Sequence, residues 1–471
     1  MKTVTAMLAA TLMIPLASAQ TTPPTYTEKW RPQFHFTSDR DWLNDPNGMV
    51  YFEGEYHLYF QRRVGQLHSD GNMTWGHAVS PDMVHWQQLP DAIKPDEHGS
   101  IWSGSAVVDW DNTSGFGRDG KPPLVAFYTA AKDPFHQRLV YSNDRGRTWT
   151  QYDGNPVIPY VHGKNRDPKV IWDKASKQWL LALYLDRPNE FGLYASPDLK
   201  SWKLLQTITI DDNECPDFFP LPLDGDASKM MWVFTGAESK YVVGTFDGRQ
   251  FTPTTDALRT ERVPSYYAAQ TFSDTPDGRR TQIGWLRRDG ELPGMPFNQQ
   301  MSFPRVLTLR STPRGPRVFA VPADEIKSIY SDSRDWKDKP IEAGKDAFSG
   351  ELTGDLYDLE ADIDLGDAKR VTLNLRGHSV SIYPEGTLAA VAAWDRRAAV
   401  PRVDGRVKLR VLVDRTSIEV FAGDGEAVFS GYHLPADNDR TISLTAEGGT
   451  AKLISFQAHR LRTAWPMPAA K

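Results

Sequence analysis

The chain has 471 residues, which is enough for two or three domains with a sizeable buried core. Its formal net charge is −6, with 54 basic and 60 acidic residues spread without long runs of one sign. Such a chain has no basic stripe to neutralise phosphates, so nucleic acid is excluded as an expected partner.

The first residues have the order of an export signal. Lys2 is followed by a mostly apolar stretch, residues 5–16, and then by Ala17-Ser18-Ala19. This order predicts a signal peptide over residues 1–19, cleaved after Ala19. The apolar stretch is too short to span a bilayer, and no later run reaches the roughly 18 apolar residues that a transmembrane helix needs. We therefore expect a secreted or periplasmic protein without membrane contact after cleavage.

Turn signals recur along the rest of the chain. The sequence has 35 glycines and 34 prolines, and Asp-Gly pairs such as Asp153-Gly154 and Asp247-Gly248 separate short runs rich in Val, Ile, Tyr, Phe and Trp. This pattern is typical of short strands joined by tight turns. The best helix candidate is short, from Pro322 to Tyr330. The single cysteine, Cys215, excludes an intrachain disulfide. The prediction is an all-β protein.

A short motif repeats in the first half of the chain. Each copy places a turn-forming Asp a few residues before an aromatic side chain, and the copies start 49 to 62 residues apart. They are Ser80–Trp86, Ser142–Trp149, Ser196–Trp202 and a degenerate Thr245–Phe251. A period of this length in a turn-rich β sequence indicates propeller blades, with one hairpin per copy and the aromatic packed between units. We predict a five-bladed propeller over residues 26–312.

The character of the sequence changes after about residue 310. Residues 313–336 are predicted to form a linker with a short helix. Beyond it, apolar and polar residues alternate, as in Val371-Leu373-Leu375 and in Val407-Leu409-Val411-Val413. Half-buried strands of this kind suit a β-sandwich, which we predict over residues 337–463.

Three acidic clusters lie in the propeller region. Each places a carboxylate beside a proline at the start of an apolar run: Asp45 in Asn44–Gly48, Asp167 between Arg166 and Pro168, and Glu214 before Cys215-Pro216. Any one of them alone would suit an ordinary turn. Three of them, one to two blades apart, indicate acids presented at the funnel of a propeller.

Paired carboxylates of this kind suit glycosidic cleavage, in which one group attacks as an anion and another donates a proton. Asp45 is flanked by Asn44, Asn47 and backbone amides, which are expected to keep it ionised. Glu214 precedes two phenylalanines, and we expect burial to raise its pKa. Arg166 is expected to keep the neighbouring Asp167 charged.

At this point the sequence resembles a known family. The three acidic clusters are similar to the signature of glycoside hydrolase family 32, which comprises invertases, inulinases, levanases and related fructosyltransferases. Further blocks match in family order from about Arg31 to Arg460: Trp75–Ala78, Trp102–Ala106, Tyr267–Thr271, Met301–Arg305 and Val413–Phe421.

The resemblance implies a five-bladed propeller with a β-sandwich, a retaining double displacement, and no metal or cofactor. It also implies roles for individual residues. Asp45 is the expected nucleophile, Asp167 the transition-state stabiliser and Glu214 the acid/base. The residues expected to bind the terminal fructosyl unit are Asn44, Gln61, Trp102, Ser103, Arg166, Tyr267 and Trp285.

The sequence departs from the family pattern at what we expect to be the rim of the pocket. Arg62-Arg63-Val64 follows Gln61, and Asp70 precedes Gly71 where a tryptophan is usual. Ser265 stands where Asp is common, and Leu286-Arg287-Arg288 follows Trp285. These changes predict a more polar entrance.

The substrate and three alternatives stay open at this point. Sucrose, inulin and levan all fit as substrates of a β-fructofuranosidase, and exo attack on fructans is the preferred interpretation. A fructosyltransferase or a non-catalytic fructan-binding relative would share the same motifs. A sialidase would also form a propeller, but nothing in the sequence indicates its arginine cluster. The oligomeric state is left open.

Overall fold

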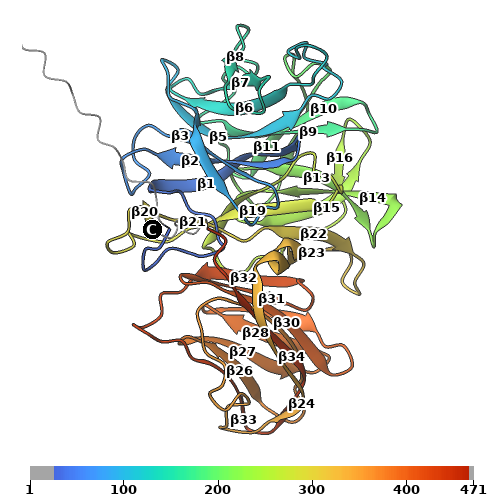
Figure 1. Cartoon of the computed structure of the whole chain (residues 1–471). Helices are drawn as coiled ribbons and strands as arrows, with labels where there is room; N and C mark the ends of the chain where they lie inside the picture. The colour runs from blue at the N-terminus through green and yellow to red at the C-terminus, as the bar shows by residue number, and fades with distance from the viewer. Residues whose placement is uncertain (1–25, 466–471) are drawn as a thin grey trace, which may run out of the picture.

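A computed structural model of the chain describes residues 26–465. The predicted signal peptide, residues 1–19, lies outside the described residues. Within that range the regular structure is almost entirely strand, with one short 3-10 helix, η1 (Asp324–Ile329), so the all-β prediction is confirmed. None of the helical structure in residues 26–465 has the length and apolarity needed to cross a bilayer. Figure 1 shows the propeller strands, coloured from blue to yellow, above the orange and red strands of the sandwich.

The propeller is built from groups of four strands that pair antiparallel. The first group is β1 (Asp41–Phe52), β2 (Glu55–Arg63), β3 (Thr74–Ser80) and β4 (Gln87–Ile93). The second is β5 (Ser100–Val108), β6 (Leu124–Ala131), β7 (His136–Ser142) and β8 (Thr150–Gln151). The third is β9 (Arg166–Asp173), β10 (Gln178–Tyr184), β11 (Glu190–Ser196) and β12 (Lys203–Thr209). Within each group, consecutive strands pair antiparallel with one another.

The last two groups share one sheet. They are β13 (Asp217–Leu223), β14 (Asp226–Thr235), β15 (Lys240–Phe246) and β16 (Phe251–Pro253), then β18 (Tyr266–Thr271), β19 (Arg280–Leu286), β22 (Arg305–Arg310) and β23 (Arg317–Pro322). Short strands at the edges are β17 (Leu258–Arg259), β20 (Phe297–Asn298) and β21 (Gln300–Met301). Because Leu223 of β13 pairs with Leu309 of β22, the count of five blades stays our interpretation of this grouping.

The repeated motif occupies the same place in each of the first four groups. Its copies form the turns that lead into β4, β8, β12 and β16. Asp82 and Asp198 accept backbone hydrogen bonds inside their turns, from His85 and Ser201, at 2.8 Å in each case. The prediction that the aromatic packs between units is confirmed for two copies. Trp149 packs edge-on against Tyr59 at 5.8 Å, and Trp202 against Phe127 at 5.9 Å, each in the preceding group.

The first strands of the groups line the axis. β1 contacts β5 and β18, and β9 contacts β5 and β13. The ring is closed by the backbone N–H of Thr271 on β18, which donates to the Asp217 carboxylate on β13 at 2.6 Å. All of these strands begin at the same end of the axis, so residues at their beginnings converge there.

The C-terminal part is a sandwich of two antiparallel sheets. One contains β24 (Tyr330–Ile341), β34 (Ala451–Leu461), β25 (Tyr357–Asp364), β30 (Arg406–Val413), β31 (Ser417–Ala422) and β32 (Ala427–Tyr432). The other contains β29 (Arg396–Pro401), β28 (Leu388–Ala393), β27 (His378–Glu385), β26 (Arg370–Leu375) and β33 (Ile442–Glu447). The predicted alternation is confirmed: Val371, Leu373 and Leu375 are buried between the sheets.

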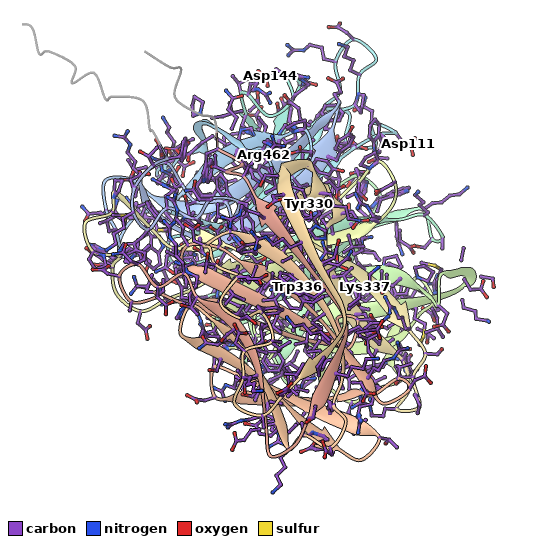
Figure 2. The ribbon with its side chains drawn as sticks, turned by 60° about the horizontal axis from the view of Figure 1, so that its bottom comes forward. Asp111, Asp144, Tyr330, Trp336, Lys337 and Arg462 are labelled. Carbon is purple, nitrogen blue, oxygen red and sulfur yellow. The ribbon has the colours of Figure 1, made fainter. Side chains whose placement is uncertain are left out.

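The predicted linker, residues 313–336, contains more regular structure than expected. It includes β23, the helix η1 and the first residues of β24. The predicted helix from Pro322 to Tyr330 is present as the six residues of η1. Figure 2 shows Tyr330, Trp336 and Lys337 along the strand that leaves this helix. Where one domain ends and the next begins stays a prediction.

A buried polar network joins the propeller to the sandwich. The Arg305 guanidinium of β22 donates to Glu261 at 2.9 Å and also pairs with Glu419 of β31. His35, which precedes β1, lies 2.9 Å from Glu419 and 2.8 Å from Asp414. All five side chains are buried, so each charge depends on its partners.

Candidate active site

Most of the strands that reach the site lose their regular pairing there. The register of β1 against β2 shifts between Leu43 and Pro46, and that of β5 against β6 shifts between Trp102 and Gly104. Similar shifts interrupt the pairing of β9 with β10 and of β18 with β19, near the first residues of β9 and β18. Since a β-bulge re-aims the side chains around it, these irregularities turn polar residues at the strand starts toward the axis.

Asp45 lies in the shifted part of β1. Ser103 Oγ donates to its Oδ2 at 2.6 Å, and Asn44 Nδ2 donates to its Oδ1 at 3.0 Å. Asn44 is oriented in turn by Trp42, whose Nε1 donates to its Oδ1 at 2.8 Å. The predicted bond from Asn47 is wrong: its Oδ1 accepts from the Gly104 N–H instead. In a regular strand Asp45 and Asn47 would share a face, but the register of β1 shifts on both sides of Asn47, between Leu43 and Pro46 and between Asn47 and Val50, and this turns Asn47 away.

Asp167 is buried, with its backbone in the left-handed region at a φ of 65°. Cys215 binds this carboxylate twice, through its backbone N–H at 3.1 Å and its thiol at 3.5 Å. The same sulfur lies 3.5 Å from Asp45 Oδ2, so the thiol stands between two carboxylates. Burial and the surrounding negative charges raise the pKa of the Cys215 thiol, which therefore stays neutral.

Glu214 faces the cavity from the segment before β13. Arg166 Nη2 donates to its Oε1 at 2.8 Å, and the Tyr267 hydroxyl lies 3.1 Å from its Oε2. The predicted burial of Glu214 is wrong, because 33% of its side chain is exposed. Phe218 and Phe219 pack into hydrophobic clusters on opposite sides of β13 and do not cover the carboxyl group.

The expected ionisation of the two aspartates also needs correction. Burial raises the pKa of Asp167 to about 7, and the attraction of Arg166 only partly opposes this. Arg166 lies 3.8 Å from Asp167 but 2.8 Å from Glu214 and 2.9 Å from Asp186. Its closest ion pairs are therefore with Glu214 and Asp186 and not with Asp167. Burial likewise raises the pKa of Asp45 despite its donors. The carboxyl cluster therefore holds a proton in weakly acidic solution.

All ten predicted site residues line one cavity of about 730 Å³. These are Asn44, Asp45, Gln61, Trp102, Ser103, Arg166, Asp167, Glu214, Tyr267 and Trp285. Among the residues described, the buried Gln61 Nε2 has no hydrogen-bond partner, which leaves it available to a ligand hydroxyl. Trp285 is fixed by a hydrogen bond from its Nε1 to Gln299 at 3.1 Å. The cavity thus combines aromatic walls with convergent polar groups.

The unusual residues of the rim act mostly from outside the cavity. Arg62 is held by Asp91 at 2.8 Å and by Asp41 at 3.0 Å, and does not line the pocket. Ser265 donates to the Ser430 carbonyl of the sandwich at 2.8 Å. Arg287 stacks over the Tyr267 ring at 4.2 Å and so supports a pocket wall. None of these three residues lines the cavity, and its polar lining comes from other residues such as Lys164 and Asp186.

Sequence reasoning missed five residues that line the cavity. They are Ser69, Gly71, Met73, Lys164 and Asp186. Asp186 follows β10 and pairs with Arg166, while its second oxygen accepts from the Lys164 backbone N–H at 2.7 Å. Lys164 lies two residues before Arg166, and that proximity was the available signal. Asp186 had no such signal in the sequence, because it reaches the site only through the pairing of β10 with β9.

The arrangement defines a glycosidase-type site. It holds three carboxylates of unequal environment, an arginine, and tryptophans that can receive a sugar ring, all at the funnel of a propeller. The model of the glycosyl hydrolases family 32 N-terminal domain matches residues 35–320, and that of the family 32 C-terminal domain matches residues 325–460. The chain belongs to glycosyl hydrolase family 32.

Known proteins agree with this assignment. The chain is 37% identical to a levanase of Bacillus subtilis, over 93% of this chain and 72% of that protein. It is 31% identical to the extracellular exo-inulinase of Aspergillus ficuum, over 93% of this chain and 96% of that protein. Among solved structures, the exo-inulinase of Aspergillus awamori is similar with a TM-score of 0.84 and 28% identity, covering 93% of this chain and all of that one. The propeller followed by a sandwich is therefore shown for this chain.

Proposed function

We propose that the chain is a secreted β-fructofuranosidase that releases terminal fructosyl units from fructans by a retaining double displacement. The observation that carries this proposal is the convergence of Asp45, Asp167 and Glu214 on one cavity, with the Cys215 thiol between the two aspartates. Exo attack on a levan- or inulin-type chain is supported by the likeness to a levanase and to exo-inulinases. Secretion rests on the predicted signal peptide and on the extracellular relative.

In the first step, an Asp45 oxygen forms a bond to the anomeric carbon of the fructosyl unit. The bond from that carbon to the leaving oxygen breaks, and Glu214 delivers its proton to that oxygen. In the second step Glu214 takes a proton from water, the water oxygen bonds to the anomeric carbon, and Asp45 leaves as a carboxylate. Two displacements at one carbon restore the original configuration.

The other groups hold the sugar and the catalytic acid. Arg166 and Tyr267 fix the Glu214 carboxyl by hydrogen bonds to its two oxygens. Asp167 is placed to accept hydrogen bonds from ring hydroxyls and to stabilise the positive charge that develops on the sugar. The aromatic faces of Trp102 and Trp285 contact the apolar side of the ring.

Two substitutions test the roles of the carboxylates. Asp45→Asn and Glu214→Gln are each expected to lower the rate of fructose release at least about 100-fold, the usual contribution of such groups. Loss of the acid affects poor leaving groups most, so Glu214→Gln should retain more activity on an aryl fructoside than on a fructan. Asp70→Asn is the matched control, because Asp70 is an exposed acid near the rim with 83% of its side chain accessible. Near-normal turnover by either catalytic variant would reject the assignment.

Retention has its own test. In methanol–water mixtures, a double displacement gives methyl β-fructofuranoside from a β-linked fructan, and proton NMR distinguishes it from the α product. An initial α product would mean a single displacement. Size-resolved products from inulin and levan separate exo attack, which releases fructose one unit at a time, from endo attack or transfer, which gives a ladder, while sucrose would give fructose and glucose.

A further inference from the structure

A second cavity lies at the opposite end of the propeller axis. The strands β5 and β9 begin at the candidate active site with Trp102-Ser103 and Arg166-Asp167. Their last residues, Val107-Val108 and Ile171–Asp173, line a separate cavity of about 740 Å³. Residues of β13 and the segment after β18 complete it. The two cavities share no lining residue among those described.

A buried polar plug separates the two cavities along the axis. Lys169 of β9 donates from Nζ to the Thr271 carbonyl of β18 at 2.5 Å, and lies 3.5 Å from Asp217 of β13. These three residues are buried, and along their strands they lie between the residues that line one cavity and those that line the other. A ligand in the second cavity therefore has no direct path to the catalytic carboxylates.

The second cavity carries an exposed and rigid tryptophan. Trp110, just after β5, is 58% exposed. Its Nε1 donates to Asp274 at 2.9 Å, and its ring packs edge-on against Phe52 at 5.8 Å. The Asp274 carboxylate is itself held by the Val108 backbone N–H. Because the ring is fixed before any ligand arrives, stacking on it costs little conformational entropy.

A second indole is presented in the same cavity. Trp172 on β9 is half-buried and packs on Trp179 with ring centroids 4.9 Å apart. Trp179 is fixed by a hydrogen bond from its Nε1 to Thr113 at 2.9 Å. Two fixed aromatic surfaces in one cavity suit a ligand built from repeated flat apolar faces, as a chain of sugar rings is.

The polar groups of this cavity suit hydroxyls better than charges. The lining holds four carboxylates and three basic side chains, so no sign of charge dominates. Such a balance does not attract a polyanion or a polycation. Within the described part of the chain, the exposed Asp111 and Lys174 side chains have no hydrogen-bond partner, so an acceptor and a donor are available. Figure 2 shows Asp111 at the margin of the molecule, where a long ligand can leave the cavity.

We propose that this cavity is a second, non-catalytic binding site for a fructan chain, with Trp110 as its main stacking surface. The identity of the chain as fructan rests on the proposed function. Because the site faces away from the catalytic cavity, it would hold the enzyme on its polymeric substrate without contributing to bond cleavage. Sucrose and other short substrates would gain nothing from it.

Binding is tested in native gels that contain levan or inulin. The full chain carrying Asp45→Asn is used, so that the polymer is not degraded during the run. Adding Trp110→Ala should weaken retardation, with an apparent dissociation constant raised about tenfold, as expected when a central tryptophan contact is lost. Leu204→Ala is the matched control, because Leu204 is a similarly exposed apolar residue, 48% accessible, on β12 outside both cavities.

Kinetics of the active enzyme give the second measurement. Trp110→Ala should leave kcat and KM for sucrose unchanged, while KM for polymeric fructan rises and its kcat is kept. Asp111→Ala, at an exposed position, should shift KM for the polymer in the same direction. Unchanged retardation in the Trp110→Ala variant, or an equal loss of activity on sucrose and polymer, would overturn the second site.

The controls separate this proposal from the proposed function. Retardation by fructan without fructose release from any substrate would reject the proposed function and keep the binding site. Fructose release together with unchanged retardation of the Trp110→Ala variant would keep the proposed function and reject the second binding site. Equal retardation in gels of dextran, a neutral glucan, would overturn fructan as the ligand.

Discussion

The buried histidine between propeller and sandwich makes stability depend on pH. Both ring nitrogens of His35 face carboxylates, Asp414 at 2.8 Å and Glu419 at 2.9 Å, so the doubly protonated ring satisfies both. Burial alone would lower the pKa of His35, but the hydrogen bonds and charges of the two acids outweigh it and raise the pKa to about 9.

The size of the effect follows from the shift. In the unfolded chain the pKa of His35 returns to its ordinary value of 6.5, so the shift spans roughly 2.5 pH units. At 1.36 kcal/mol for each unit, this is about 3 kcal/mol of stability. Because the folded state binds the proton more tightly, this stability is fully present below pH 6.5. It is lost as pH rises from there through about 9.

Unfolding by guanidinium, followed by tryptophan fluorescence at pH 6, 7.5 and 9, measures the effect. The native chain should lose about 3 kcal/mol of unfolding free energy over this range. His35→Gln should be less stable at pH 6 and lack most of that slope, since Gln does not titrate. His85→Gln is the matched control, because His85 is an exposed histidine bound to Asp82. Parallel pH slopes for the native chain and His35→Gln would refute the reasoning.

Three further predictions follow from the site and the core. Burial raises the pKa of Asp167 to about 7, and its proposed role in stabilising positive charge needs the ionised carboxylate. The kcat/KM for fructan should therefore rise as pH increases toward 7, and a fall in the pH–rate profile over that range would contradict it. Tyr267→Phe removes a partner of Glu214, and steady-state kinetics should show kcat lowered more than binding. Phe251→Ala empties a fully buried position and should cost about 3–5 kcal/mol in denaturant unfolding, against under 1 kcal/mol for the exposed Leu204→Ala.

The fold was predictable because its signals are local. The turn motif before Trp86 and Trp202 depends on an Asp side chain that binds backbone two or three residues ahead, which a linear sequence displays directly. The alternation at Val371, Leu373 and Leu375 likewise depends only on the two-residue period of a strand. The number of blades was harder to predict and to count, because a single pairing, Leu223 with Leu309, merges two of them into one sheet.

The members of the site were predictable, but their environments were not. Asp45, Asp167 and Glu214 were found from motifs, whereas each also has a partner from a distant part of the chain: Ser103, Cys215 and Arg166, respectively. Glu214 is next in sequence to apolar residues, yet its nearest groups are Arg166 and Tyr267 from β9 and β18. Neighbours along a strand point to opposite faces, so sequence proximity says little about burial or charge.

The backbone at the site carries conformations that the fold must hold in place. Asp167, Glu214 and Cys215 have φ values of 65°, 40° and 37°, each in the left-handed region that non-glycine residues avoid. Such residues cost of order 1–3 kcal/mol each, and the crowded carboxylates oppose folding as well. Tight packing between successive blades, as of Trp202 on Phe127, supplies the opposing stability. At the point where the blades converge, Asp167 and Glu214 are each restrained by contacts from other parts of the chain.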